Sequence, residues 1–329
     1  MKNAFITGIC GQDGFYLYNH LTSLGFNVKG TDIFKCQWAD EKKAIVNIEL
    51  LNKNEVFEFL NKFCPDEIYH LAAYNYSSEV KIENDISVFN KSYENNVLTT
   101  LHLLDWIKNF SPKTKMFYAG TSHMFGNIKE YPQTEESKFE PNCPYGISKY
   151  LGMSAFRYYR NTYGIFASVG ILYNHESPRR SPKFISQKIV KNAVDIKLGL
   201  KNTLVVGNLN SIVDWGYAGD YVEAMYKILQ QKKPSDFIIS SGEKKTVKDF
   251  IKIVFNILGI NFKKHVTEDP SLLRPSKKGI LIGDNSKLKN ETTWYKVTSL
   301  EMLAKIMVNK EIERRSCDKN KNSDICSNI

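Results

Sequence analysis

The stretch "NAFITGICGQDGFYL", residues 3–17, decides the fold. A short apolar run ends at Thr7, glycines follow at Gly8, Gly11 and Gly14, and a helical pattern begins among them. Such glycines let the backbone turn tightly and approach a pyrophosphate, whose charge is stabilised at the helix N-terminus. An ordinary strand-to-helix turn is the alternative, and the rest of the chain must decide between the two.

The second predicted strand, "FNVKGTD", supports a dinucleotide site. It ends in Asp32, eighteen residues after Gly14. A carboxylate at this place accepts hydrogen bonds from both ribose hydroxyls of NAD and repels a 2′-phosphate, so NAD is favoured over NADP. Further on, Asn47 and Ile48 are candidates for holding the adenine between an amide oxygen and an apolar wall. On spacing alone, a plain strand end explains that pair equally well.

Strand-like and helix-like segments alternate through the first half of the chain. Apolar strand patterns recur at 66–73, 115–122 and 165–173, with helical patterns between them. This alternation predicts an α/β fold with a Rossmann-type, doubly wound parallel sheet. We expect residues 1–172 to form an NAD-binding Rossmann domain. Residues 173–312 are expected to be mainly a smaller C-terminal substrate-binding lobe, with some segments returning to the Rossmann core. The polar residues 313–329 are expected to be a disordered tail.

The bulk composition excludes several classes of protein. Of the 329 residues, 42% are hydrophobic and 24% charged, as in ordinary globular proteins, and no apolar run approaches a membrane span. The six cysteines are scattered without a CxxC pair, which favours reduced thiols in a cytoplasmic protein over a disulfide or zinc framework. The net charge of +10 accompanies no nucleic-acid-binding motif. An anionic small-molecule substrate is therefore favoured, with no metal, nucleic acid or membrane as partner.

A candidate catalytic group combines a strand end with a helix. Tyr145 and Lys149, in "PYGISKYLG", are four residues apart and so share one face of a predicted helix. An ammonium beside a phenol lowers the pKa of the phenol, which makes Tyr145 a usable base for a sugar hydroxyl. Lys149 can also hold the nicotinamide ribose, and Thr121, in "AGTS", can bond the same substrate oxygen. An exposed aromatic and cationic helix face is the rival interpretation, which Thr121 weakens.

These motifs together resemble the extended short-chain dehydrogenase/reductases, whose marks are TGxxGxxG after a strand, HLAA, a Ser or Thr after the next strand, and Tyr-x-x-x-Lys. Within that group, three stretches resemble the GDP-mannose 4,6-dehydratases: "ITGICGQDGFYL", "ILYNHESPRR" and "GNLNSIVDWGYAGDYVEAM". The last two are much more specific than a generic dinucleotide-binding pattern. The resemblance covers roughly residues 1–310.

The resemblance implies roles for individual residues. It assigns cofactor binding to Gly8, Gly11, Gln12, Asp13, Gly14, Leu71, Ala72 and Ala73, catalysis to Thr121, His123, Tyr145 and Lys149, and substrate binding to Ser122, Asn174, Glu176, Lys183, Phe184, Lys188 and Arg274. It also implies a GDP-linked sugar as substrate and a homodimer or homotetramer. Independently of it, Arg179, Arg180 and Arg274 suit a fork-shaped anion contact, with a solvated loop as the alternative for the arginine pair.

The chain departs from the family pattern at three places. His123 stands where the family has the glutamate that removes the C5 proton, and Val213 stands where an arginine usually precedes Asp-Trp. Many close family members favour NADP and have basic residues after the second strand, whereas this chain has Asp32.

The histidine leaves three interpretations open. A neutral imidazole can act first as base and then as acid, which preserves oxidation at C4 of a GDP-hexose or GDP-heptose followed by elimination of water across C5 and C6. The site can instead stop at C4 oxidation, as a dehydrogenase or a C4 or C5 epimerase. His123 can also simply pack under the nicotinamide, which combines with the second interpretation. We favour dehydration, in surface-polysaccharide assembly, because the neighbouring stretches stay close to the dehydratase pattern. A catalytically silent NAD-binding sensor is the alternative from another class.

Overall fold

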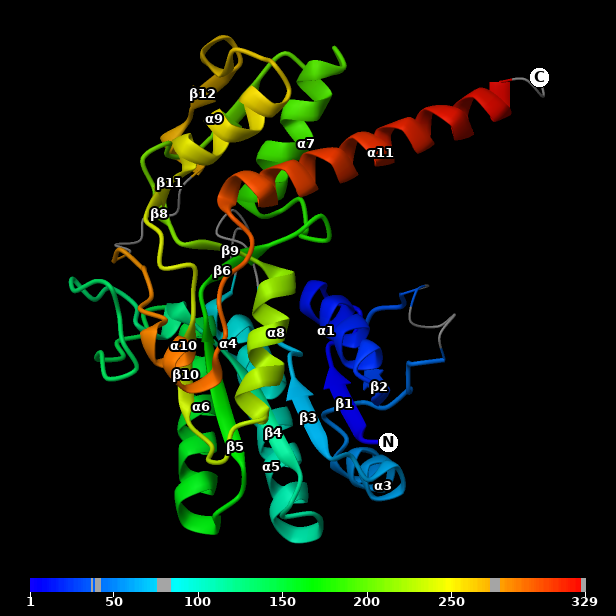
Figure 1. Ribbon diagram of the computed structural model, residues 1–329, viewed down its shortest axis with the longest axis vertical. Helices are drawn as coiled ribbons and strands as arrows, with labels where there is room; N and C mark the ends of the chain where they lie inside the picture. The colour runs from blue at the N-terminus through cyan, green and yellow to red at the C-terminus, as the bar shows by residue number, and fades with distance from the viewer. Residues whose placement is uncertain (37, 39–42, 76–83, 273–278, 327–329) are drawn as a thin grey trace.

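The computed structural model describes residues 1–36, 38, 43–75, 84–272 and 279–326. A six-stranded sheet forms the centre of the larger lobe, in the order β10-β5-β4-β3-β1-β2 (Figure 1). Every pair of neighbouring strands in it is parallel. The strands are β1 (Asn3–Thr7), β2 (Asn27–Thr31), β3 (Glu67–His70), β4 (Lys115–Thr121), β5 (Ala167–Leu172) and β10 (Asp236–Ile239). The predicted Rossmann-type, doubly wound parallel sheet is confirmed.

Helices cover both faces of this sheet. Those of the larger lobe are α1 (Gln12–Ser23), α3 (Lys53–Phe63), α4 (Asp85–Tyr93), α5 (Thr99–Phe110), α6 (Pro144–Tyr163), α8 (Ala218–Leu229) and α10 (Ser286–Thr292), with a π-helical turn at Glu94–Leu98 and a 3₁₀ turn at Ser122–Met124. One apolar core lies between the sheet and α1 and α8, and includes Leu21 and Met225. A second core, which includes Trp106 and Phe156, lies against α3, α5 and α6. Strand residues are buried on both faces, as a parallel sheet requires.

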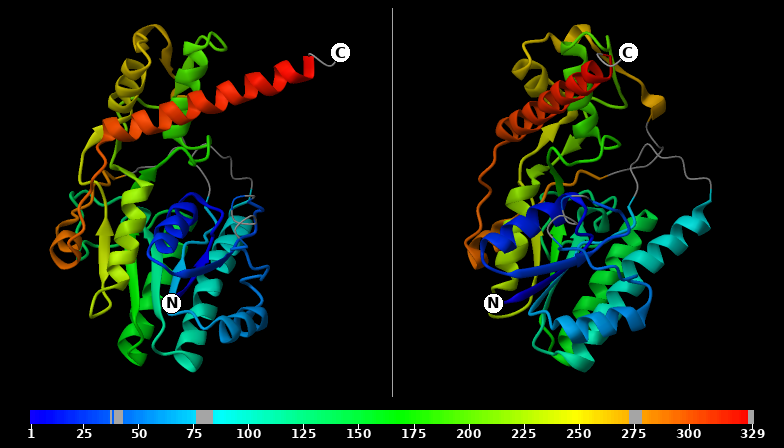
Figure 2. Two further views of the ribbon diagram at one scale, coloured as in Figure 1. Left: turned by 45° about the vertical axis from the view of Figure 1, so that its right-hand side comes forward. Right: turned by 90° about the vertical axis from the view of Figure 1, so that its right-hand side faces the viewer.

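The smaller lobe has its own apolar core. Its elements are β6 (Asn174–Glu176), α7 (Ile185–Lys197), β7 (Leu204–Val206), β8 (Ile212–Val213), β9 (Trp215–Tyr217), β11 (Lys245–Thr246), α9 (Val247–Ile257), a 3₁₀ turn at Phe262–Lys264, β12 (Val266–Glu268), a 3₁₀ turn at Pro270–Leu272, and α11 (Leu300–Cys326). Apolar residues of α7, α9 and α11 pack together around Val190, Phe250 and Met307. Figure 2 shows this lobe beyond the carboxyl ends of the sheet strands.

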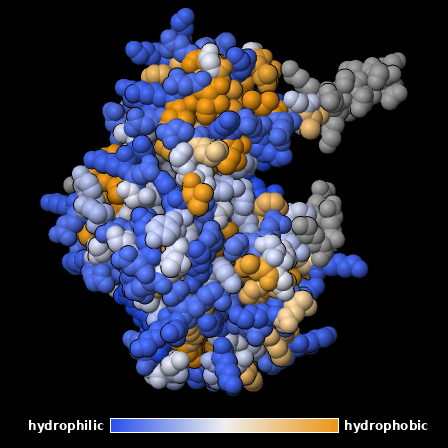
Figure 3. All heavy atoms as spheres, in the orientation of Figure 1, coloured by the Kyte–Doolittle hydropathy of each residue, from blue (hydrophilic) through white to orange (hydrophobic). Residues whose placement is uncertain are grey.

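The chain passes between the lobes more than once. After β9 it returns to the larger lobe as α8 and β10, goes back as β11 and α9, and returns again as α10. In Figure 3 the surface is indented between the two lobes, beneath α11. The carboxyl ends of β1, β2, β3 and β4 face the smaller lobe (Figure 2). Ligands of open parallel sheets bind at the carboxyl ends of the strands.

The C-terminal segment differs from its expected disorder. Helix α11 continues to Cys326, so residues 313–326 are helical in the structure. The start of this segment is held from the side: the Arg314 guanidinium donates to the Pro178 carbonyl oxygen at 2.6 Å, and Arg315 pairs with Asp195 at 2.8 Å. Polar composition had suggested disorder for residues 313–329, but Arg314 and Arg315 have fixed partners, and residues 327–329 lie outside the described residues. Within the described residues, no helix combines the length and apolar content needed to cross a bilayer.

Two cysteines are paired, although the composition favoured reduced thiols. Cys10, in the glycine-rich loop, and Cys36, after β2, form a disulfide with their Cα atoms 5.6 Å apart. Because β1 and β2 are parallel neighbours, the segments that follow them meet at the same edge of the sheet. Spacing along the chain cannot show this, since α1 separates the two residues. Among the other cysteines with described side chains, Cys64, Cys143 and Cys317 are unpaired.

Candidate active site

The glycine-rich loop joins β1 to α1 at the carboxyl end of the sheet. Gly8 adopts φ +75°, and a Cβ there would meet the backbone nitrogen of Ala72 at 2.9 Å. Gly14 lies so close to the Gly8 carbonyl oxygen that a Cβ would stand 2.5 Å from it. Only glycine fits either position, and Gly11 is the N-cap of α1. The loop therefore exposes backbone N–H groups at the start of a helix, which suits a pyrophosphate.

The residues that follow β2 and β3 flank this loop. Asp32 accepts hydrogen bonds from the backbone N–H groups of Cys10 (2.9 Å) and Phe34 (3.0 Å), so its carboxylate lies directly beside the loop. The backbone N–H of Ala72 donates to the Thr7 hydroxyl at 3.1 Å; Leu71 and Ala73 are its neighbours in the chain. The predicted cofactor residues of these segments thus converge on one edge of the sheet.

The structure gives less direct support for Asn47 and Ile48 as the residues that bind the adenine. Asn47 is exposed, while Ile48 is half-buried and its carbonyl oxygen accepts from the Thr31 hydroxyl at 2.9 Å. An isolated bridge between Gly30 and Ile45 precedes this pair in the chain. Ile48 lies near the end of β2, but an adenine contact through Asn47 stays a prediction.

The catalytic candidates come from β4 and α6. Thr121 ends β4, and its hydroxyl is hydrogen-bonded to the phenol of Tyr145, in the first turn of α6. Lys149, one turn later, is buried; its ammonium donates to the Ala119 carbonyl oxygen at 2.8 Å and lies 4.7 Å from the ring centre of Tyr118. All three predicted residues are therefore together at the carboxyl end of β4.

Burial is the largest influence on the pKa of both Tyr145 and Lys149. Burial raises the pKa of Tyr145 to about 12, although the Thr121 hydrogen bond and the charge of Arg180 act in the opposite direction. Burial lowers the pKa of Lys149 to about 7. Lys149 lies against the Tyr118 ring and the Ala119 carbonyl oxygen. The charge of Arg180, from the smaller lobe, lowers the pKa of Tyr145.

His123 lies directly beside the phenol. It belongs to the 3₁₀ turn that continues β4, its backbone N–H donates to the Thr121 hydroxyl at 3.3 Å, and its ring meets that of Tyr145 edge to face with centres 6.0 Å apart. The preceding Ser122 is buried. An imidazole beside the phenol can act as a second acid or base towards a ligand bound there.

The stretch "NHESPRR" faces this group from the smaller lobe. Arg180 pairs with Glu176 at 3.2 Å and stacks on Phe184, while Ser186 donates to Glu176 at 2.5 Å. Of the other predicted substrate residues, Asn174 begins β6, Lys183 is exposed and Lys188 is half-buried on α7. Arg274 lies outside the described residues. Arg180 thus approaches the catalytic group, whereas Glu176 is held within its own lobe.

A charge pair that sequence reasoning missed joins the two lobes; His175 is buried and Asp13 is half-buried. His175 pairs through Nε2 with the Asp13 carboxylate at 2.8 Å, and its Nδ1 lies 2.8 Å from the Tyr173 carbonyl oxygen. Gln12 donates to the His175 carbonyl oxygen at 3.0 Å and accepts from Ser177 at 2.8 Å. The motifs "GQDG" and "NHESP" were each noted, but no local pattern shows that they touch.

The protonation of this pair follows from its partners. Carbonyl and carboxylate oxygens only accept, so both ring nitrogens of His175 must donate, as in an imidazolium. Burial by itself lowers the pKa of His175, but the charge and hydrogen bond of Asp13 outweigh it, and the pKa is raised above 6.5. Burial likewise raises the pKa of Asp13, but His175 and Gln12 outweigh it, and the pKa falls below 3.8.

We expect His175→Asn to lower the free energy of unfolding by about 3 kcal/mol, because it leaves the Asp13 carboxylate without its cation. The raised pKa of His175 contributes its full stability below the pKa of the unfolded state, and this contribution is lost as pH rises through the folded-state pKa. The lowered pKa of Asp13 contributes stability above the pKa of the unfolded state, and this contribution is lost as pH falls through the folded-state pKa. The difference from wild type should therefore be largest between pH 3.8 and 6.5. Urea unfolding at several pH values measures it. The double variant Asp13→Asn/His175→Asn should recover most of the loss, and a pH-independent difference would contradict the charge pair.

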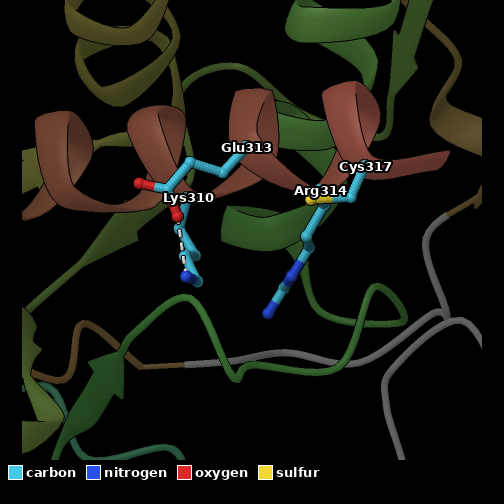
Figure 4. A pocket seen from close by; sticks show the side chains of 4 residues that line it. All are labelled: Lys310, Glu313, Arg314 and Cys317. Carbon is cyan, nitrogen blue, oxygen red and sulfur yellow. Dashed lines mark hydrogen bonds and ion pairs between the residues drawn. The ribbon is translucent and has the colours of Figure 1, made fainter. Parts of the chain in front are cut away.

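One open surface hollow lies away from these groups. It has a volume of about 330 Å³, lies on α11, and is lined by Lys310, Glu313, Arg314 and Cys317 (Figure 4). Its walls come from one helix, and Arg314 is already engaged by Pro178. Among the described residues, no cluster of histidine, cysteine and carboxylate side chains could hold a metal ion.

Two solved nucleotide-sugar enzymes share this architecture. The chain superimposes on the Bacillus anthracis dTDP-glucose 4,6-dehydratase, solved in complex with NAD, with a TM-score of 0.80 at 20% identity, over 96% of this chain and 98% of that one. The Thermus thermophilus UDP-glucose 4-epimerase, also with NAD, gives a TM-score of 0.80 at 21% identity, over 94% and 98%. At such identities the likeness concerns the fold.

The sequence comparisons define the class of protein, an enzyme of the nucleotide-sugar dehydratase/epimerase type. The sequence profile described as GDP-mannose 4,6 dehydratase matches residues 5–307. The chain is 37% identical to the Arabidopsis thaliana GDP-mannose 4,6 dehydratase 1, over 95% of this chain and 90% of that protein, and 33% identical to the Vibrio cholerae GDP-mannose 4,6-dehydratase, over 95% and 94%. It belongs to the GDP-mannose 4,6-dehydratase family, as the resemblance predicted.

Proposed function

We propose that this enzyme oxidises C4 of a GDP-linked hexose and then eliminates water across C5 and C6. The observation that carries the proposal is the position of His123, edge to face with Tyr145 at the end of β4. The relatives named GDP-mannose 4,6-dehydratase support the same reaction for this chain. A GDP-heptose is the alternative substrate, and surface-polysaccharide assembly and a cytoplasmic location stay predictions.

The chain's own residues divide the proposed reaction into two stages. Tyr145 takes the proton of the C4 hydroxyl, with Thr121 holding the same oxygen by a hydrogen bond. The ketone formed at C4 makes the C5 proton acidic. His123 then removes that proton through a neutral ring nitrogen and passes a proton to the hydroxyl that leaves C6. A dinucleotide held at the glycine-rich loop and Asp32 would supply the hydride acceptor and donor that the two stages need.

The loop beside Asp32 fits a nicotinamide dinucleotide. Gly8 and Gly14 leave a cradle that a Cβ would fill, at the N-terminus of α1. Asp32 keeps unused acceptor capacity for ribose hydroxyls, since each of its oxygens accepts one backbone N–H. A 2′-phosphate would meet this carboxylate, which favours NAD over NADP. Arg180, which pairs with Glu176 at 3.2 Å and whose charge acts on Tyr145, is the candidate contact for the diphosphate of the sugar nucleotide.

One incubation tests the reaction. Purified enzyme is mixed with GDP-mannose and either NAD or NADP, and product mass is followed together with the absorbance of reduced nicotinamide. We expect the loss of one water with no net reduced cofactor, and faster turnover with NAD. An unchanged mass with a new stereochemistry would instead indicate an epimerase, and loss of two hydrogens with stoichiometric reduced cofactor a dehydrogenase. Cofactor binding without any product would favour the silent sensor.

We also propose that two copies of the chain associate through α4 and α6, which pack against one another. Ile86, Phe89 and Tyr93 on α4, and Ile147, Leu151 and Tyr158 on α6, are large and exposed. Each set repeats at helical spacing, so each helix presents one apolar stripe. A twofold axis would pair the stripes with themselves.

The variant Leu151→Glu is expected to shift the protein to a monomer, because the carboxylate would be buried without a partner at the interface. Sedimentation at micromolar concentration measures the mass. The matched control Met302→Glu, at an exposed methionine of the smaller lobe, should leave the wild-type mass unchanged. A monomeric wild-type protein would overturn this association.

A further inference from the structure

The two cysteines of the disulfide stand on opposite sides of Asp32. Cys10 belongs to the glycine-rich loop, and Cys36 is four residues beyond Asp32 in the segment that follows β2. The backbone N–H of Cys10 donates to one oxygen of the Asp32 carboxylate, and Phe34 donates to the other. The bridge therefore closes a ring of covalent and hydrogen bonds around the carboxylate that would hold the ribose.

The segment that carries Cys36 is also packed against α1. Trp38 meets the rings of Phe15 and Tyr18, both on α1, edge to face with centres 5.1 Å apart in each case. Cys10 and Cys36 themselves pack against the apolar core below the loop. With the bridge closed, the loop before α1 and the segment after β2 are joined at two points, the disulfide and this aromatic contact.

The pair is open to reaction with small thiols. Both cysteines are half-buried rather than enclosed, and their Cα separation of 5.6 Å lies in the range that a disulfide spans without backbone movement. Cys64, Cys143 and Cys317, the other cysteines with described side chains, have no such neighbour. Redox chemistry between described thiols is thus confined to the cofactor end of the enzyme.

We propose that Cys10 and Cys36 form a reversible thiol–disulfide clasp that controls how fast the dinucleotide exchanges. A thiolate of the pair attacks glutathione disulfide, forming a mixed disulfide and releasing one glutathione thiolate. The second cysteine thiolate then displaces the other glutathione. The protein loses two protons and two electrons, and glutathione disulfide is reduced to two thiols. The closed clasp ties together the two walls of the ribose site.

The role of the clasp in cofactor exchange rests on the proposed function. The hydride taken from C4 returns to C6, so each turnover regenerates the cofactor and needs no exchange. Slower exchange therefore leaves turnover intact and keeps the enzyme loaded under oxidising conditions. Opening the clasp lets the two walls separate and allows the cofactor to leave.

The test is a release experiment on the full chain. Enzyme loaded with NAD is treated with either glutathione disulfide or dithiothreitol, and release is followed after dilution into a fluorescent NAD analogue. Peptide mapping after alkylation reports the bond. We expect a bond between Cys10 and Cys36 only after oxidation, with release slowed about tenfold. Cys36→Ser should remove the difference between the two treatments. The matched control Cys64→Ser should keep it.

The outcomes separate the clasp from the proposed reaction. Failure to form the bond, or a bond without a change in release, overturns the clasp even where GDP-mannose is dehydrated normally. Redox-dependent release in wild type, lost in Cys36→Ser, supports the clasp even where no sugar product forms, and in that case it is the proposed function that fails.

Discussion

Replacement of Tyr145 by phenylalanine is expected to lower kcat by about a thousandfold, with little change in dinucleotide affinity. The phenol is the group that takes the C4 hydroxyl proton, and its hydrogen bond to Thr121 aligns it with the end of β4. The variant keeps the ring that meets His123, so the fold and the shape of the site remain. A single-turnover measurement of cofactor reduction reports the first stage directly.

Tyr150 provides the control for this experiment. It lies on the same helix, but its ring packs on Phe139 with centres 5.5 Å apart, away from the catalytic group. Tyr150→Phe should react at nearly the wild-type rate. If Tyr145→Phe still reduces its cofactor at the wild-type rate, another group takes the proton and the proposed first stage is wrong. Because burial raises the pKa of Tyr145 to about 12, the wild-type rate of this stage should rise with pH across the neutral range.

The second large effect is expected from His123→Gln, which should separate the two stages. Glutamine keeps a polar side chain of similar reach but cannot shuttle a proton, so elimination should slow by roughly 10²–10⁴-fold while C4 oxidation persists. The cofactor would then remain reduced with the ketone bound. In deuterium oxide, incorporation of deuterium at C5 should disappear in the variant, which identifies the lost step as removal of that proton.

Two further variants complete the argument for His123. His123→Glu restores a group that can act as base and then acid, and it should recover elimination. His265→Gln, in the smaller lobe, is the control, since the His265 ring bonds the Asn202 carbonyl oxygen and takes no part in the site. Wild-type elimination by His123→Gln would assign the base to another residue. Absence of elimination in the wild-type protein, gained in His123→Glu, would show that the histidine diverts the enzyme to epimerase or dehydrogenase chemistry.

Local sequence was sufficient for the parts of the enzyme that lie within one strand and the turn after it. The glycines of residues 8–14 are required by the turn itself, and Asp32 ends a strand that must lie next to the first. Thr121 was predicted because strand β4 ends there, and Tyr145 and Lys149 because four residues bring side chains to one helix face. In each case a short-range rule fixes the geometry.

Features that depend on contacts between distant segments could not be read in this way. Asp13 and His175 are 162 residues apart, and Cys10 and Cys36 meet only because β1 and β2 are neighbours. The orientation of Lys149 depends on the ring of Tyr118, from another element. The helix at 313–326 is polar by composition, but Arg314 and Arg315 bind groups of the smaller lobe that its own sequence does not reveal.

The late position of β10 in the chain has a consequence for how the protein is made. Strand β5 ends at Leu172, yet its outer partner β10 begins at Asp236, after α7 and α8 have been synthesised. Until then the edge of β5 has no partner, and an open strand edge is prone to pair with other chains. Until Asp236 is synthesised, Arg157 and Arg160 also lack the carboxylate to which they donate hydrogen bonds at 2.7 and 2.9 Å in the folded protein. The ribosome must therefore synthesise the part of the smaller lobe that precedes Asp236 before β10 can pair with β5 and complete the sheet of the larger lobe.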